Sequence, residues 1–446
     1  MRSVWAPLAL AALASLAEAC GGGHHKHDDR VWTAEEIAEL EYKWGMESRE
    51  IDLRTHRRCD NCGLPSGLQI CGSVDGYDDE LTFARLQWPF AGIGSFAHLK
   101  HVKCLTDPTE LYDIAIVGAP FDTAVSYRPG ARFGPRAIRH ASSRQTSFRG
   151  FNPRANINPY QNWAKIMDCG DIPIVPVDNA VAIRQMTEAF TELGSRRPVS
   201  PLLEKPKLIT LGGDHSLALP ALRALNKIYG KPLRVLHFDA HLDTWHPAKY
   251  PSSWLTDQAH FNHGSMFWLA GSEGLLVNET SRPSVHAGLR TRLSGNGWDD
   301  FDDDTAQNWL RVVADDIDDL GTSGVVKAIL DAIPPDDPVY LSVDIDVLDP
   351  AFAPGTGTPE PGGWTTRELI RILRGIESLN VVGADVVEVA PAYQGQGEET
   401  ALAAAQVVYE MISSIVKKGM AEMGKEHAAP EVEGDKTEEE VVKDEL

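Results

Sequence analysis

The stretch that decides the fold is V-L-H-F-D-A-H-L-D, Val235 to Asp243. It begins with a short apolar segment and continues into Asp239, His241 and Asp243, three potential metal ligands spaced two residues apart. Residues two apart on an extended chain share a face, so the three side chains can converge on one point. Carboxylate oxygens and imidazole nitrogen suit a divalent ion such as Mn²⁺, and the absence of thiolates argues against a closed structural zinc site. The stretch therefore predicts a strand that ends in a metal site.

Two other stretches are organised in the same way. The apolar run Leu208 to Leu211 leads into G-G-D-H-S, which contains His215, and Val339 to Val343 leads into Asp344 and Asp346. Each pattern is typical of a buried strand with polar residues at its carboxyl end, where open α/β sheets bind ligands. Taken singly, each of these motifs often marks only a turn or a loop with surface acids. Three such strand ends together predict one shared site.

Further apolar runs and helical periodicities alternate along the chain. Additional strands are predicted at 112–119, 285–289 and 381–387, and helices at 217–230, 323–333, 366–377 and 399–416. This alternation predicts an α/β fold with three layers, α/β/α, around a central, mostly parallel sheet. The long connection from Thr244 to Asn262 is typical of a functional lid.

At this point the chain resembles the ureohydrolase family of arginases and agmatinases, and it looks most like the agmatinases. Resemblance covers roughly residues 75–420 and implies the arginase-like version of this fold. It rests on these motifs: G-G-D-H-S at 212–216, D-A-H-L-D at 239–243, S-V-D-I-D-V-L-D-P at 342–350, H-G-S-M-F at 263–267, S-Y-R-P-G-A-R-F-G-P at 126–135, P-G-T-G-T-P-E at 354–360 and E-V-A-P-A-Y at 388–393.

The resemblance also implies a pair of Mn²⁺ ions. One ion would be held by His215 and Asp243 and the other by His241 and Asp346, with Asp239 and Asp344 bridging the two. Bridging carboxylates reduce the repulsion between two nearby divalent ions. A water bound by both ions loses its proton near neutral pH, and the resulting bridging hydroxide would attack the carbon of a guanidinium substrate.

Two more side chains acquire roles from the resemblance. His263 would deliver a proton to the leaving amine, for which imidazole has a suitable pKa. Glu388 would hold the guanidinium through hydrogen bonds, since a carboxylate accepts from that planar group. Together with Asp243, these residues form the predicted catalytic set. A loop histidine and a structural acid at a strand end are the alternatives.

Substrate choice depends on Trp245. Arginases of this pattern have an asparagine there, which helps to hold the α-carboxylate of the substrate, whereas an indole offers a single donor. The substitution favours agmatine, with urea and putrescine as products. The alternatives are guanidinobutyrate or another ω-guanidino compound and, in a different class, a non-catalytic lumenal metal-binding protein. The resemblance also implies a homo-oligomer, a trimer or a hexamer.

Both ends of the chain carry targeting signals. Residues 1–19 combine Arg2, an apolar run and Ala17-Glu18-Ala19, which is typical of a secretory signal peptide. The last four residues, Lys443 to Leu446, spell a retrieval signal for the endoplasmic reticulum, so we expect retention in its lumen, with secretion as the alternative. Asn278-Glu279-Thr280 is a glycosylation sequon that fits this compartment.

Residues 20–74 form a predicted extension with a histidine cluster, for which a solvated linker is favoured over a metal site. In an oxidising lumen we expect disulfides among Cys59, Cys62, Cys71 and Cys104 rather than a zinc or redox site, with Cys20 and Cys169 further out.

The chain is acidic, with a net charge of −22, and residues 421–446 contain ten acids against three lysines. That composition predicts a disordered tail and argues against nucleic-acid binding. After the signal peptide no apolar stretch reaches the length of a membrane span. Six arginines between Arg128 and Arg149 favour ion pairing over the binding of an anionic ligand.

Overall fold

The computed structural model describes residues 94–249 and 260–427, together with Thr33 and Glu36. Within these residues, eight strands form a single sheet in the order β2-β1-β3-β8-β7-β4-β5-β6, and every neighbouring pair is parallel. The α/β prediction is therefore confirmed, with a sheet that is wholly rather than mostly parallel. The strands are β1 Ile114–Ala119, β2 Ile166–Asp171, β3 Lys207–Gly212, β4 Arg234–Phe238, β5 Ser284–Leu289, β6 Trp309–Val313, β7 Pro338–Asp344 and β8 Asn380–Val387.

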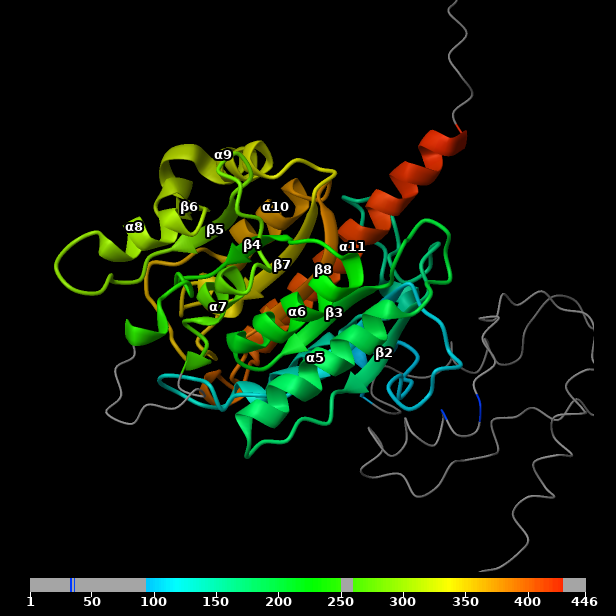
Figure 1. Cartoon of the computed structure of the whole chain (residues 1–446). Coiled ribbons are helices and arrows are strands. Elements are labelled where there is room, and N and C mark those ends of the chain that lie inside the picture. The colour runs from blue at the N-terminus through cyan, green and yellow to red at the C-terminus, as the bar shows by residue number, and fades with distance from the viewer. Residues whose placement is uncertain (1–32, 34–35, 37–93, 250–259, 428–446) are drawn as a thin grey trace, which may run out of the picture.

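Helices cover both faces of the sheet, as Figure 1 shows. Buried side chains of α5, α6 and α7 pack on one face, and those of α4, α9, α10 and α11 pack on the other. The helices are α4 Gly134–Ala141, α5 Asn179–Ser195, α6 Ala218–Tyr229, α7 Met266–Ser272, α8 Asp299–Ala306, α9 Asp316–Ala332, α10 Thr366–Gly375 and α11 Glu399–His427. Short 3₁₀ turns are η2 Phe96–His98, η3 Ala131–Phe133, η4 Ser142–Arg144, η5 Ser147–Arg149, η6 His215–Leu217, η7 Pro247–Lys249, η9 Ile345–Val347 and η10 Pro391–Tyr393.

Strand β1 shows why two helical layers are needed. Ile114 and Ile116 join the core under α11, whereas Ala115 and Val117 join the core under α5 and α6. Successive side chains of a strand point to opposite faces, so a strand that is apolar throughout must be covered on both sides.

The helix boundaries differ from the predicted ones where the backbone changes conformation. Helix α6 ends at Tyr229 because Gly230 adopts a left-handed conformation with φ of 65°. Helix α9 begins at Asp316, earlier than predicted, and is interrupted at Gly321. Helix α11 continues to His427, past its predicted end at residue 416 and into the segment 421–446 that was predicted to be a disordered tail.

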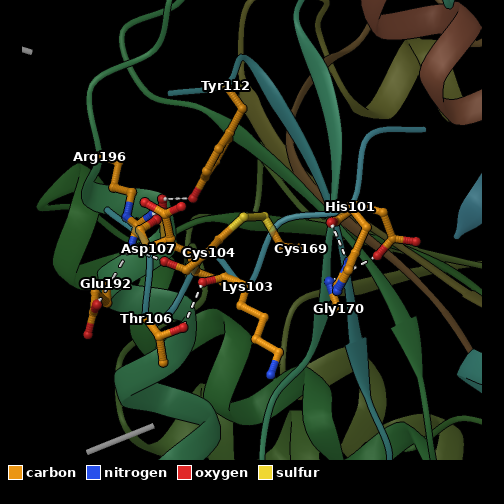
Figure 2. The surroundings of a disulfide bond; sticks show 12 residues. His101, Lys103, Cys104, Thr106, Asp107, Tyr112, Cys169, Gly170, Glu192 and Arg196 are labelled. Atoms are coloured by element: carbon orange, nitrogen blue, oxygen red, sulfur yellow. Dashed lines mark hydrogen bonds and ion pairs between the residues drawn. A yellow bond between two sulfur atoms is a disulfide. The ribbon is translucent and has the colours of Figure 1, made fainter. Parts of the chain in front are cut away.

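A disulfide bond joins Cys104 to Cys169, and thus ties the segment before β1 to strand β2 (Figure 2). The expectation for Cys104 was therefore wrong, because it pairs with Cys169 and not within the group at 59–71. Arg196 lies beside the bond and donates to the carbonyl oxygen of Cys104. Nothing in the local sequence indicates that β2 and this segment are neighbours, which is why spacing along the chain misleads.

The arginine-rich segment forms ion pairs, as predicted. Arg132 pairs with Asp122, and Arg139 pairs with both Asp168 and Asp171. No helix in the described part of the chain combines the length and the hydropathy needed to cross a bilayer. The predicted signal peptide, the extension to residue 74 apart from Thr33 and Glu36, residues 250–259 of the long connection and the last part of the tail lie outside the described residues.

Candidate functional site

Four adjacent strands bring the predicted site residues together. In the sheet order β3-β8-β7-β4, His215 follows β3, Glu388 follows β8, Asp346 follows β7 and Asp239 follows β4. Carboxyl ends of parallel strands meet at one edge, so residues far apart in sequence become neighbours there. Gly213 is required for the turn after β3, because a Cβ at this position would lie 1.8 Å from the carbonyl oxygen of Phe121.

The inner half of the site is the group around His215, with Asp239, Asp243 and Asp344. The Nδ1 atom of His215 lies 3.1 Å from a carboxylate oxygen of Asp239, 3.1 Å from one of Asp243 and 3.3 Å from one of Asp344. All of these side chains are buried. Three acids thus point at one imidazole nitrogen.

The outer half of the site is the group of His241, Asp239 and Asp346. The Nδ1 atom of His241 lies 3.2 Å from Oδ1 of Asp239 and 3.1 Å from Oδ2 of Asp346. Asp239 therefore belongs to both halves, with one oxygen directed to each. This arrangement is what a carboxylate that bridges two cations requires.

The crowded carboxylates of the site favour the binding of cations. Burial, followed by the charges of Asp346 and Asp239, raises the pKa of Asp344 well above its usual range. Burial and the neighbouring Asp239 likewise raise the pKa of Asp243, to about 6. Crowded buried carboxylates resist ionisation unless positive charge compensates them. Two groups of possible ligands each place their donor atoms within 4.8 Å of one another: His215, His237, Asp239 and Asp243, and Asp239, His241 and Asp346. This donor set suits a binuclear metal site.

His263 and Glu388 lie beside the inner half and contact each other. The Nδ1 atom of His263 is 3.0 Å from Oε1 of Glu388, and the backbone N–H of Ser126 donates to its Nε2 over 2.9 Å. In the neutral ring, Nε2 accepts from this N–H and Nδ1–H donates to Glu388, because a backbone N–H can only donate. Burial alone would lower the pKa of His263, but the hydrogen bond and charge of Glu388 outweigh it and raise that pKa to about 9.

Glu388 has an unusual backbone and an unused oxygen. Its φ is 60°, and Asp243 also has a positive φ, 55°, a conformation that is costly for residues other than glycine and that clusters at functional sites. Oε1 accepts a hydrogen bond from the backbone N–H of His215, but the buried Oε2 has no hydrogen-bond partner among the described residues. A buried carboxylate oxygen without a donor is ready to accept one from a ligand.

A pocket of about 190 Å³ lies over His241, Asp243, His263 and Asp344. Trp245 forms part of its wall, and its indole N–H donates to Asp300 over 3.0 Å. The only polar donor of this side chain is thus already used. The lining residues are Ser126, His241, Asp243, Trp245, His263, Gly264, Asp344 and Thr358.

Several side chains that contact the predicted metal ligands were not predicted from the sequence. His237 lies 2.9 Å from Asp239 Oδ2, and Ser342 Oγ lies 2.7 Å from Nε2 of His215. Ser342 also donates to Asp385, which accepts from Tyr340 as well. His237 could have been found, because it precedes Asp239 by two residues and shares its face. The contact between Ser342 and His215 could not have been found in this way, because it depends on the order of the strands in the sheet.

Comparisons with known proteins agree with this geometry. The model of the arginase family matches residues 112–413. The chain is 48% identical over 338 residues to a Schizosaccharomyces pombe protein with a provisional agmatinase name, covering 74% of this chain and 83% of that one. It is 39% identical over 336 residues to the agmatinase of Chromobacterium violaceum, covering 74% and 91%. Among solved structures, proclavaminate amidino hydrolase from Streptomyces clavuligerus matches with a TM-score of 0.63 and 34% identity, covering 74% of this chain and 100% of that one.

These matches span most of the chain and most of each relative. They include the strand ends that carry the metal-ligand groups, the histidine–glutamate pair and the pocket above them. From the sequence, the geometry and the comparisons together, the chain belongs to the arginase family.

Proposed function

We propose that this ureohydrolase hydrolyses agmatine to putrescine and urea. The observation that carries the proposal is the free, buried Oε2 of Glu388 beside a binuclear metal site. A guanidinium is a flat cation with several N–H donors, and it would satisfy this oxygen. Gly357 packs closely against this oxygen, since a Cβ there would lie 3.3 Å from Oε2.

Glu388, His263 and Ser126 have separate roles in the proposed reaction. The metal ions, when bound, would supply a strong nucleophile at neutral pH by lowering the pKa of a shared water. Glu388 orients the guanidinium carbon toward the two ligand groups. His263 holds a proton for the leaving amine, and Glu388 stabilises the imidazolium that carries it. Ser126 Oγ, 2.7 Å from Nε2, can accept the hydrogen of the protonated ring.

The pocket favours a substrate without an α-carboxylate. The N–H of Trp245 is held by Asp300, so the indole presents an apolar surface to the ligand. The lining residues within the described part of the chain include no lysine or arginine that could pair with a carboxylate. Agmatine carries an ammonium group and no carboxylate, so it fits this acidic setting better than arginine or guanidinobutyrate, each of which carries a carboxylate.

A panel of guanidino substrates tests the proposal. Purified protein loaded with Mn²⁺ should release urea from agmatine with kcat/KM at least about tenfold above that for arginine, guanidinobutyrate and proclavaminate-like compounds. A higher kcat/KM for guanidinobutyrate than for agmatine would show that guanidinobutyrate is the preferred substrate. Metal binding without urea release from any compound would favour a non-catalytic binding protein.

Mn²⁺ is the ion that we propose for both sites. Imidazole and carboxylate ligands without thiolate suit it, although such donors also bind other divalent ions more tightly. Metal analysis of protein purified without chelator, followed by reconstitution with Mn²⁺, Co²⁺ and Zn²⁺, tests this assignment. Higher activity with another ion at physiological concentration would contradict it.

We also propose a homo-oligomer. Three phenylalanines on one segment, Phe133, Phe148 and Phe151, are 57%, 84% and 57% exposed. Large exposed aromatic side chains gathered in one region often mark an interface between subunits. Light scattering coupled to size-exclusion chromatography should give a trimer or a hexamer, and a monomer at micromolar concentration would contradict the proposal.

Retention in the lumen of the endoplasmic reticulum is the proposed location. The Cys104–Cys169 disulfide fits an oxidising compartment, and Asn278 of the sequon is exposed. In eukaryotic cells, Asn278→Gln should remove a glycosidase-sensitive shift in mass, and deletion of residues 443–446 should release the protein into the medium. Cytosolic protein without a glycan would overturn this location.

A further inference from the structure

A buried row of four side chains leads away from the metal ligands. His237 Nε2 lies 2.9 Å from Asp239 Oδ2, and His237 Nδ1 lies 2.7 Å from Nδ1 of His286. His286 Nε2 lies 3.0 Å from Oδ1 of Asp304. All four side chains are fully buried. The row therefore connects the bridging carboxylate of the site to helix α8, without contact with solvent.

The sheet and its aromatic neighbours hold the two rings in place. His237 on β4 and His286 on β5 occupy the same register position, which brings both rings to one side of the sheet. His286 stacks on Trp309 with centroids 4.0 Å apart, and Phe267 packs edge-on against His237 at 4.9 Å. Rings packed in this way cannot turn freely, so each nitrogen keeps its partner.

Asp304 anchors the far end of the row. Arg311 donates to its Oδ2 over 2.6 Å, and Thr244 Oγ1 donates to its Oδ1 over 2.7 Å. Burial alone would raise the pKa of Asp304, but the charge of His286 and these hydrogen bonds outweigh it and lower the pKa. Asp304 is thus an ionised acceptor, and His286 Nε2–H donates to it.

The same carboxylate holds both ends of the metal-ligand segment. Through His286 and His237 it reaches Asp239, the first ligand, and through Thr244 it holds the residue that follows Asp243, the last ligand. Gln307 adds a hydrogen bond of 2.9 Å to the carbonyl oxygen of Thr244. These contacts hold the residue next to Asp243, whose own backbone has a left-handed conformation with φ of 55°.

We propose that Asp304, acting through His286 and His237, is a positioning residue that fixes the bridging carboxylate of Asp239 for metal binding. Buried polar groups cost free energy that apolar side chains would avoid, so a row like this one adds little to folding and much to the geometry of the group at its end. The inference rests on the two-metal site of the family. Loss of such a supporting contact typically weakens metal affinity by about 10- to 100-fold.

The test uses the full-length protein stripped of metal by a chelator. Asp304→Asn keeps the size of the side chain but removes its charge, and Asp303→Asn, an exposed neighbour on α8, is the matched control. Calorimetric titration with Mn²⁺ should show affinity about 10- to 100-fold weaker for Asp304→Asn and unchanged for the control. With saturating Mn²⁺, the KM for agmatine should stay within about twofold of wild type, because no member of the row lines the pocket.

A second variant separates positioning from a general loss of structure. His286→Phe keeps the stack on Trp309 but breaks the row, so it should weaken Mn²⁺ binding to a similar extent, and the double variant should be no weaker than either single one. If Asp304→Asn does not fold, the Mn²⁺ affinity of His286→Phe decides whether the row positions Asp239. Wild-type affinity in the folded variants, or losses that add in the double variant, would overturn the proposal. The Mn²⁺ titration does not depend on which guanidino compound is hydrolysed. Its result can therefore be interpreted even if agmatine is not the substrate.

Discussion

The two halves of the metal centre differ in how their ligands are supported. In the inner half, His215 is fully buried, and its Nε2 contacts Ser342, which in turn donates to Asp385 over 2.7 Å. In the outer half, 14% of the His241 side chain is exposed, and its Nε2 lies 3.8 Å from Glu360. One histidine is thus held by a closed network and the other by a long contact near solvent.

This difference predicts different tasks for the two halves. Hydrogen bonds in a buried setting are strengthened by the low dielectric, and a network in which each member has a partner resists rearrangement. The inner half is therefore suited to retaining its ion. Both halves border the pocket, the inner one through Asp243 and Asp344 and the outer one through His241. The looser support of His241 would allow the outer half to adjust to a ligand.

The largest effect is expected where the halves join. Asp239→Asn removes a negative charge that serves both groups, so both ions should be lost and urea release should fall by at least about 10³-fold. Metal content measured by mass spectrometry, together with the activity, checks this outcome. A variant that still holds two ions would show that the halves do not depend on a shared carboxylate.

A large effect without metal loss is expected at His263. His263→Ala removes the proton carrier but no ligand, so turnover should fall by about 10²-fold or more while two ions remain bound. His140→Ala, a histidine with 72% of its side chain exposed on α4, is the control and should behave as wild type. Equal loss of metal and activity in His263→Ala would place this histidine in the metal centre instead.

An intermediate effect is expected behind the inner half. Asp385→Asn replaces one acceptor oxygen with an N–H₂ group that faces the hydroxyl donors of Ser342 and Tyr340. The tighter of two stepwise Mn²⁺ affinities should weaken by about 10-fold or more, with the weaker one less affected. Asp336→Asn, an exposed acid before β7, serves as the control. If the weaker affinity changes more, the network supports the outer ion.

Most of the fold could be predicted because the central strands are mostly apolar. The strands absent from the prediction are β2, with the sequence I-M-D-C-G-D, and β6, with W-L-R-V-V. Both lie at the edges of the sheet. An edge strand needs less apolar cover and can carry polar residues such as Asp168 and Arg311, so its sequence lacks the continuous run that marks a buried strand.

In the candidate site, too, some features could be predicted from the sequence and others could not. Ligands at spacing two, such as Asp239 and His241, follow from the geometry of a single strand end. The supporting contacts do not, because His286 reaches His237 only when β5 lies beside β4. The unpaired, buried Oε2 of Glu388 was also beyond prediction, since a missing hydrogen-bond partner is seen only in the folded site.

The smallest effect is expected at the open edge of the outer half. Glu360 is 22% exposed at its side chain and also lies 3.7 Å from Arg292, so solvent screens its influence on His241. Glu360→Gln should therefore change metal affinity and kcat by less than about fivefold, as for other exposed ion pairs. Glu273→Gln, which breaks a surface pair with Arg223 of comparable exposure, sets the scale for a change remote from the site. A loss for Glu360→Gln greater than that for Asp385→Asn would reverse the comparison, because the outer half would then be the one that depends on its support.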